Sequence, residues 1–321
     1  LVGYGAFRTN AVSGVDGVIN KPMTTDADGP SGFTSFLSES VIYNTCAYQA
    51  ECVLGSTWNV ELAERMGELV GEEGIIGNEK GDKLPYTGWY APAVNIHRSP
   101  FAGRNWEYYS EDGVLSGKFA AKVIDGAATR GVYCYVKHFA VNDQETDREY
   151  NGILVWLNEQ AMREIYLKPF EIAVKTSGTK VNGMMSSFNR LGMKWAGGSY
   201  ALLTAVLRNE WGARGPVITD YSLNTYTHVD EMIRAGGDLF LTQDAKTFNK
   251  EDDATQISLL RKSTKNILYA VANSNAMGAT IIGYKRPVWQ NVMFGIDIGL
   301  AVLLALWGIL AIRRGKKKAK A

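Results

Sequence analysis

Between residues 85 and 245, short apolar runs alternate with longer amphipathic stretches. This alternation is typical of strand–helix units that build a parallel sheet. We expect strands at residues 90–96, 131–137, 181–187, 216–220 and 237–241. We expect helices at residues 59–72, 112–129, 157–176, 199–212, 226–236 and 255–273. The pattern therefore predicts an α/β fold.

The length of the chain narrows this fold class. The chain has 321 residues, 46% of them hydrophobic, which is enough for one large core. A (β/α)8 barrel takes about 250 residues. We therefore expect a TIM-like barrel over residues 1–286. It is either complete or short at its N-terminus, because the opening LVGYGAF resembles the end of a helix and loop that have lost their beginning.

Polar and aromatic residues follow several of the predicted strands. These are His97-Arg98, His138, Phe188-Asn189-Arg190 and Asp220-Tyr221, in chain order. The carboxyl ends of parallel strands meet at one end of a barrel, where the active sites of such folds lie. The sequence therefore predicts a functional site at that end.

The C-terminal segment has a different character. Residues 292–312 contain a single charged residue, Asp297, and at about 1.5 Å per residue they span roughly 30 Å. We expect a transmembrane helix within 287–312, with Trp289 at its outer interface. A buried core helix is the alternative, but it leaves the basic tail 313–321 unexplained. The positive-inside rule places this tail in the cytoplasm and the barrel outside the cell, as in a single-pass protein of the cell membrane.

Composition excludes several classes of partner. The net charge is +1, and since the tail holds six positive charges, the rest of the chain sums to −5. An acidic body is a poor nucleic-acid binder, so no nucleic acid is expected. The three cysteines form no CxxC pair and the three histidines lie far apart, so neither a metal site nor a disulfide framework is predicted. No glycine-rich phosphate loop is present, and we expect no cofactor.

Each candidate site residue has a purely structural interpretation beside the functional one. Asp220 could cap the next helix, and Asp28 could belong to an Asp-Gly-Pro turn. Lys137 and His138 could pair with Asp143 or Glu145 as ordinary strand-end residues, and Arg104 has a similar ambiguity.

The functional interpretation is sugar binding. Fixed cationic donors suit vicinal hydroxyls, and an aromatic such as Tyr221 beside a carboxylate suits the C–H face of a sugar ring. Retaining glycosidases need a nucleophilic carboxylate and a second carboxyl about 5 Å away as the acid. Asp220 is the candidate nucleophile. The sequence offers Glu107, Asp143 and Glu145 for the second role without favouring one of them.

Five motifs in this order carry a resemblance: DADGPSG, APAVNIHRSPFAGRNWEYYSEDG, VKHFAVNDQETDR, GMMSSFNRLGMKWAGGSYALLTAVLRNEWGARGPVITDY and IRAGGDLFL. Over residues 20–275 the chain resembles the barrel domain of glycoside hydrolase family 3, the β-glucosidase-like enzymes. The resemblance implies a retaining exo-β-glycosidase that needs neither metal nor organic cofactor.

Carried over by position, the resemblance implies that Asp220 is the nucleophile. It implies that Asp28, Arg104, Lys137 and His138 bind the hydroxyls of the terminal sugar, that Met185 lies against that sugar, and that Arg148 belongs to the same charged network.

Two positions depart from the family's pattern. Tyr221 replaces the commoner Trp, which puts the leaving-group preference in doubt. Phe188 stands where many members have a Tyr that contacts the nucleophile, so we expect other groups to orient Asp220.

The family resemblance also implies where the acid comes from. The loop FAVNDQETDR does not resemble that of the N-acetylglucosaminidase branch, which carries its own Asp-His acid pair. In the other branch a separate α/β domain supplies an acid/base Glu. Since a membrane helix follows the barrel here, we expect an inverted domain order. This chain is then part of a longer protein, with that domain upstream of Leu1 or acting in trans.

The expected function is hydrolysis of terminal non-reducing β-linked sugars from an oligosaccharide or glycoside. The alternatives are a membrane-anchored, catalytically impaired carbohydrate-binding barrel and a single-span receptor. The sequence leaves the sugar and the linkage open.

Overall fold

The computed structural model describes residues 8–9, 12, 21–34, 45–76, 86–148, 152–178, 182–222, 226–242, 254–277 and 288–318. The chain divides into two compact units, Leu1–Ala279 and Thr280–Ala321. Each unit is considered by itself.

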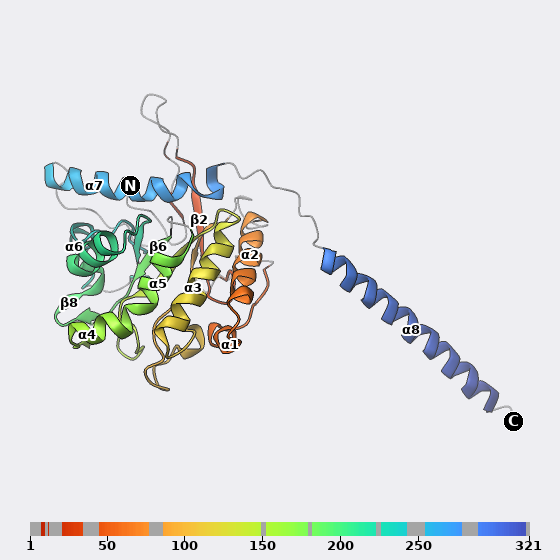
Figure 1. Ribbon diagram of the computed structural model, residues 1–321. Helices are drawn as coiled ribbons and strands as arrows, with labels where there is room; N and C mark the ends of the chain where they lie inside the picture. Colours follow the sequence, from red (N-terminus) through yellow and green to blue (C-terminus); the bar gives the residue numbers. More distant parts are fainter. Residues whose placement is uncertain are drawn as a thin grey trace. The chain divides into compact units, whose positions relative to one another are not determined.

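The first unit is built on a six-stranded sheet in the order β1-β2-β3-β4-β6-β9. Strands β2 and β6 of this sheet are labelled in Figure 1. The strands are β1 (Arg8–Thr9), β2 (Thr24–Asp28), β3 (Tyr86–Tyr90), β4 (Tyr133–Phe139), β6 (Gly183–Ser186) and β9 (Val217–Thr219). β1 is antiparallel to β2, and the other neighbours are parallel. A parallel bridge from Ile218 to Leu239 continues the sheet beyond β9.

This sheet confirms the α/β, TIM-like class but not the closed eight-stranded barrel that the length suggested. Over the described residues it forms a parallel half-barrel with one antiparallel edge strand. A second, three-stranded sheet lies outside it, in the order β5-β7-β8. Its strands are β5 (Leu154–Val155), β7 (Arg190–Leu191) and β8 (Lys194–Trp195).

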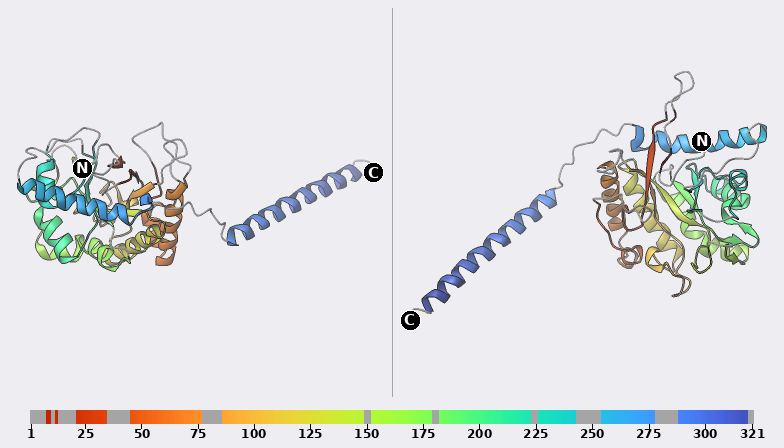
Figure 2. Two further views of the ribbon diagram at one scale, coloured as in Figure 1. Left: turned by 90° about the horizontal axis from the view of Figure 1, so that it is seen from above. Right: turned by 180° about the vertical axis from the view of Figure 1, so that it is seen from behind.

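Helices cover the outside of the sheet (Figure 2). The α-helices of the first unit are α1 (Glu51–Ser56), α2 (Val60–Ile76), α3 (Gly113–Ala128), α4 (Glu159–Ala161), α5 (Lys168–Thr176), α6 (Val229–Ala235) and α7 (Ala254–Ala272). Two π-helices are η3 (Met162–Tyr166) and η5 (Ala201–Glu210). Short 3-10 turns are η2 (Asn105–Glu107), η4 (Ala196–Gly198) and η6 (Asn275–Met277).

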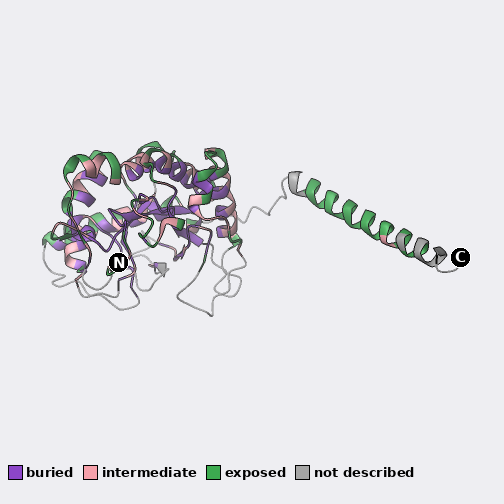
Figure 3. Cartoon of the chain, turned by 90° about the horizontal axis from the view of Figure 1, so that it is seen from below, coloured by how far each residue is buried: buried purple, intermediate pink, exposed green. Residues whose placement is uncertain are grey.

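The α2–α3 contact shows how closely the helices pack. A Cβ on Gly67 of α2 would lie 2.1 Å from the Val123 carbonyl oxygen of α3, and a Cβ on Gly126 would lie equally close to Glu64. Glycine at these two positions therefore lets the helix backbones meet. The buried residues of both helices face the neighbouring helix and the sheet, and the strands between the helices are buried (Figure 3).

Several element boundaries differ from those predicted. The strand expected at 90–96 ends at Tyr90, and the chain after it forms a loop that begins at Ala91. The helix expected at 157–176 divides into α4, η3 and α5, with Asn158 capping the first by accepting from the Ala161 N–H. The predicted strand 237–241 forms only the bridge at Leu239.

Several elements escaped prediction, among them the short strands β1, β5, β7 and β8, strand β2 and helix α1. Strand β2 has the sequence TTDAD, and its two aspartates interrupt any apolar run. Helix α1, the next α-helix along the chain, has only six residues. Strand β2 forms because its backbone pairs with β3 over Thr25–Asp28. Tertiary pairing here outweighs local propensity.

The second unit contains helix α8 (Val288–Lys318). Its residues Asn291–Leu310 are long and apolar enough to cross a membrane, and none of them is buried within the protein (Figure 3). This agrees with the segment predicted from sequence at 292–312.

Candidate active site

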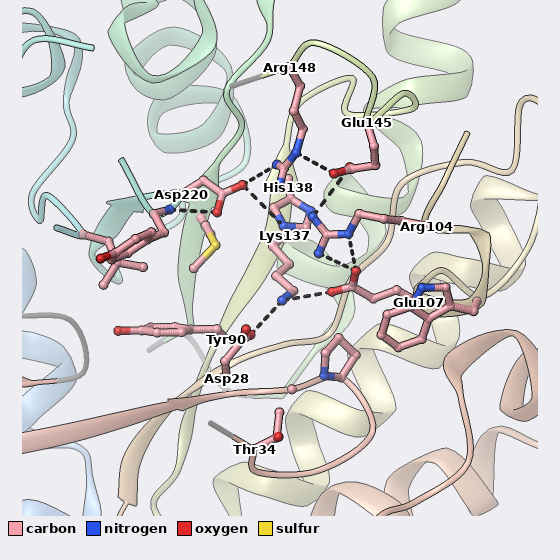
Figure 4. Close-up of a pocket in the computed structure, with 16 residues that line it drawn as sticks. Asp28, Thr34, Tyr90, Arg104, Glu107, Lys137, His138, Glu145, Arg148 and Asp220 are labelled. Atoms are coloured by element: carbon pink, nitrogen blue, oxygen red, sulfur yellow. Dashed lines mark hydrogen bonds and ion pairs between the residues drawn. The ribbon is translucent and has the colours of Figure 1, made fainter. Parts of the chain in front are cut away.

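A cavity of about 370 Å³ lies at the carboxyl ends of the parallel strands (Figure 4). Strand β2 contributes Asp28, β3 contributes Tyr90, β4 contributes Lys137 and His138, and β6 contributes Met185. Asp220 and Tyr221 follow β9 directly. The remaining lining residues are Gly29, Pro30, Thr34, Arg104, Trp106, Glu107, Glu145, Arg148 and Leu241.

All eight residues selected from the sequence line this one cavity. Six of them come from strand ends, as the parallel-strand argument anticipated. Arg104 and Arg148 come from the loops after β3 and β4. The structure therefore brings the predicted set together, while the role of each residue stays a prediction.

The charged side chains of the cavity form one continuous series, which we call the ion-pair chain. In order it contains Asp28, Lys137, Glu107, Arg104, Glu145, Arg148 and Asp220, with acids and bases alternating. The Lys137 ammonium lies 2.9 Å from Asp28 and 3.0 Å from Glu107. Since a lone buried charge is costly, each cation is stabilised by carboxylates on two sides.

Asp220, at the end of the ion-pair chain, accepts a hydrogen bond at each of its two carboxylate oxygens. Arg148 Nη1 donates to Oδ2 at 2.7 Å, and the Tyr221 backbone N–H donates to Oδ1 at 2.8 Å. His138 Nε2 lies 3.6 Å from the same Oδ2. The Phe188 ring packs against the Arg148 guanidinium at 4.8 Å. Arg148 and the backbone thus fix the carboxylate where residue 188 has no hydroxyl to offer.

The electrostatics of the ion-pair chain favour its charged forms. Burial alone would lower the pKa of Lys137, but Asp28 and Glu107 outweigh it and the pKa is raised. Burial would raise the pKa of Glu107, but Lys137 and Arg104 outweigh it and the pKa is lowered.

His138 behaves in the opposite way. Burial and the neighbouring Arg104 and Lys137 hold its pKa well below the usual value. The imidazole is therefore neutral near pH 7. Its Nε2 faces the Asp220 carboxylate at 3.6 Å, which is longer than a hydrogen bond.

The observed partners of these residues differ from most of the capping and strand-end pairings considered from the sequence. Helix α6 has His228 at its N-cap, so Asp220 does not cap it. Lys137 pairs with Asp28 and Glu107 rather than with Asp143 or Glu145. Asp143 pairs with Arg98 at 3.1 Å and does not line the cavity. Asp28 does precede a tight turn, yet its side chain is committed to Lys137.

Sequence reasoning missed several lining residues, among them Tyr90, Thr34, Pro30 and Leu241. Tyr90 carried a signal, because it is the aromatic that ends the apolar β3 run. Thr34 and Leu241 carried no such signal, because nothing in their local sequence shows that their segments lie against the cavity.

A buried carboxyl lies close beneath the cavity floor. Asp26 of β2 accepts from the Tyr133 hydroxyl at 3.2 Å and from the hydroxyl of the cavity residue Tyr90 at 3.5 Å. Burial raises the pKa of Asp26 to about 7, although the tyrosine hydroxyls and Lys21 oppose this. Asp26 is thus poised between its two forms near neutral pH.

Among the described residues, no group of three or more His, Cys, Asp and Glu side chains could hold a metal ion. The described cysteines Cys46, Cys52 and Cys134 are free thiols. The cavity lining itself contains carboxylates, cationic hydrogen-bond donors and aromatic rings.

Comparison with known proteins agrees with this geometry. The model of the glycosyl hydrolase family 3 N-terminal domain matches residues 18–272. Beta-glucosidase B of Emericella nidulans is 31% identical over 306 residues, covering 91% of this chain and 34% of that protein. Beta-glucosidase A of Butyrivibrio fibrisolvens is 37% identical over 203 residues, covering 63% of this chain and 23% of that protein.

Solved structures show the same likeness. Beta-glucosidase 3B from Thermotoga neapolitana, in complex with glucose, superimposes with a TM-score of 0.70 at 34% identity. The match covers 90% of this chain and 40% of that one. The chain thus spans a quarter to two fifths of the length of these relatives.

The raised pKa of Asp26 predicts a pH-dependent stability. The folded carboxyl keeps its proton up to about pH 7, whereas the unfolded one loses it near 3.8. Wild-type protein should therefore lose stability as the pH rises from 4 to 7, by an amount on the order of 4 kcal/mol at about 1.4 kcal/mol per pKa unit. Asp26→Asn, which stays neutral, should lack this component.

The measurement is urea unfolding of the full chain in detergent from pH 4 to 8, followed by tryptophan fluorescence. The control is Asp147→Asn, a change at an exposed residue whose φ of 62° suits asparagine. Parallel stability profiles for wild type and Asp26→Asn would show that Asp26 does not titrate in this way.

Proposed function

Because the chain belongs to glycosyl hydrolase family 3, we propose that it forms the nucleophile-bearing domain of a retaining exo-β-glycosidase. The observation that carries the proposal is the fixed Asp220 carboxylate at the wall of a cavity rich in charged donors. The substrate is a terminal non-reducing β-linked sugar. The beta-glucosidase relatives support a glucose-configured one.

In the proposed first step, a carboxylate oxygen of Asp220 attacks the anomeric carbon. A glycosyl–aspartate bond forms and the bond to the leaving-group oxygen breaks. Arg148 and the Tyr221 N–H hold the carboxylate in place before the attack. Water then attacks the same carbon, the aspartate leaves, and two inversions give overall retention.

The sugar hydroxyls in this proposal are held by Asp28, Arg104, Lys137 and His138, with Met185 against the ring. The cationic side chains are anchored by the ion-pair chain, so little conformational freedom remains to be lost when the sugar binds. Tyr221 stands at the side of the leaving group.

The proton for the leaving group has no evident donor among the three acids considered. Glu107 has a lowered pKa and both its oxygens accept from cations. Glu145 pairs with two arginines, and Asp143 lies outside the cavity lining. We therefore place the acid/base Glu in a domain outside this chain, supplied upstream or in trans.

The rival function is a membrane-anchored carbohydrate-binding barrel that turns over poorly. The engagement of Glu107 and Glu145 in ion pairs favours it, because neither is free to donate a proton. It retains the sugar site and predicts sugar binding without a covalent intermediate.

Asp220→Asn should lower hydrolysis of dinitrophenyl β-glucoside by roughly 10⁴-fold or more, because the amide is a very poor nucleophile. Asp147→Asn, on the loop beside Arg148, should leave the rate unchanged. NMR of the wild-type reaction should show the β-anomer of the sugar first. Initial release of the α-anomer would exclude the retaining mechanism.

Protonation of the leaving group by a general acid contributes about 10²–10⁴-fold. The chain alone should therefore be slowed by about that factor on cellobiose, and much less on dinitrophenyl β-glucoside, whose leaving group needs no proton. The ratio of the two kcat/KM values measures this. A ratio near that of an intact family member would locate an acid within residues 1–321.

We also propose that α8 anchors the protein in the cell membrane, with the tail 313–321 in the cytoplasm and the first unit outside. Its apolar residues support this, since Leu303 and Leu306 are exposed to 63% and 52%. The double variant Leu303→Arg/Leu306→Arg should stop flotation with lipid vesicles. Phe101→Arg, at an exposed residue of the first unit, should not. Unchanged flotation of the double variant would contradict the anchor.

A further inference from the structure

Glu107 lies between Lys137 and Arg104 in the ion-pair chain and is among its most buried members. Its side chain is 2% exposed, less than Asp28 at 19% or Asp220 at 12%. Its Oε1 accepts from the Lys137 ammonium at 3.0 Å, and its Oε2 accepts from the Arg104 guanidinium. One carboxylate thus joins two cations that both line the cavity (Figure 4).

We propose that Glu107 is a positioning residue that sets the spacing of the Lys137 and Arg104 donors and thereby determines which sugar hydroxyls they recognise. This inference rests on the function proposed above. Glu107 acts through its two partners and not on the reacting atoms.

The two cations come from different parts of the fold, so something must fix their distance. Lys137 belongs to strand β4, whereas Arg104 lies in the loop before η2. Both have long side chains with several free torsions, and without a fixed anion each could reach other acceptors. Glu107 bonds to both at once, which ties the loop to the strand at a defined separation.

The backbone around Glu107 is itself well anchored. The Glu107 N–H donates to the Arg104 carbonyl at 2.9 Å, which keeps the two residues on one turn. The next residue, Tyr108, bonds through its carbonyl to His97 Nε2 at 2.8 Å and through its hydroxyl to the Asn142 carbonyl at 3.3 Å. The carboxylate therefore has a fixed position from which to hold its partners.

A role for Glu107 as the general acid fits this geometry poorly. Both oxygens accept from cations, and Lys137 with Arg104 lowers the pKa of the carboxyl in spite of its burial. A carboxylate that is held ionised has no proton to give at neutral pH. Positioning is the function left to it in this site.

The test compares Glu107→Gln and Glu107→Asp with wild-type full-length chain on dinitrophenyl β-glucoside and its 2-, 3-, 4- and 6-deoxy analogues. Glutamine removes the charge, and aspartate keeps the charge but is one methylene too short to reach both cations. We expect kcat/KM on the glucoside to fall by about 10- to 10²-fold. The loss should shrink on the analogues that lack the hydroxyls bound by Lys137 and Arg104.

Asp143→Asn is the matched control, because Asp143 is another buried carboxylate, and it pairs with the more exposed Arg98 outside the cavity lining. It should change all five substrates by one common, small factor. If the Glu107 variants also lose activity by the same factor on every substrate, Glu107 has a merely structural role. Unchanged activity would equally overturn the proposal.

Should Glu107→Gln fail to fold, Glu107→Asp decides the question, because it preserves the charge balance. If the wild-type chain neither hydrolyses nor binds a glucoside, the proposed function is wrong, but the positioning role of Glu107 is still open to test. Crystal structures of wild type and variant then still test the positioning role. Displaced Lys137 and Arg104 side chains support it, and side chains in unchanged positions overturn it.

Discussion

The pairing of the buried Lys137 ammonium with Asp28 and Glu107 is the interaction on which the site depends. An ammonium that is 3% exposed is stable in its charged form only if carboxylates replace the water it has lost. Its two partners come from β2 and from the loop before α3, so this one cation joins distant parts of the chain. The same requirement, repeated for Arg104 and Arg148, extends the ion pairs as far as Asp220.

The fold supplies the geometry that makes this pairing possible. Strands β2, β3, β4, β6 and β9 run parallel, so their carboxyl ends meet around one hollow. A parallel half-barrel is sufficient for this purpose. The cations bring donors for hydroxyls, and the neutral His138 adds a donor without adding charge. The arrangement suits a polyhydroxy substrate that approaches a fixed carboxylate.

Much of this site could be predicted because the signals were local. Lys137, His138 and Asp220 each follow an apolar run, and parallel strands guarantee that such positions converge. The aspartates of β2 hid that strand, because TTDAD has no hydrophobic pattern and becomes a strand only by pairing with β3.

The interaction partners within the site were beyond prediction. Glu107 and Glu145 are separated by a helix and a strand, and only the folded chain shows that Arg104 lies between them. The number of strands could not be predicted, and over the described residues the sheet is a parallel half-barrel with one antiparallel edge strand. The N-terminal strand β2 is partly polar, so the hydrophobic pattern did not reveal it.

The central claim is that Asp220 is a nucleophile. Full-length chain should be incubated with 2-fluoro-β-glucosyl fluoride, whose fluoride leaves without a proton, and then analysed by intact mass and peptide mapping. The account predicts a fluoroglucosyl adduct on Asp220 that is absent from Asp220→Asn. No adduct, in a protein that still binds glucose by calorimetry, would contradict it and identify the chain as a sugar-binding barrel.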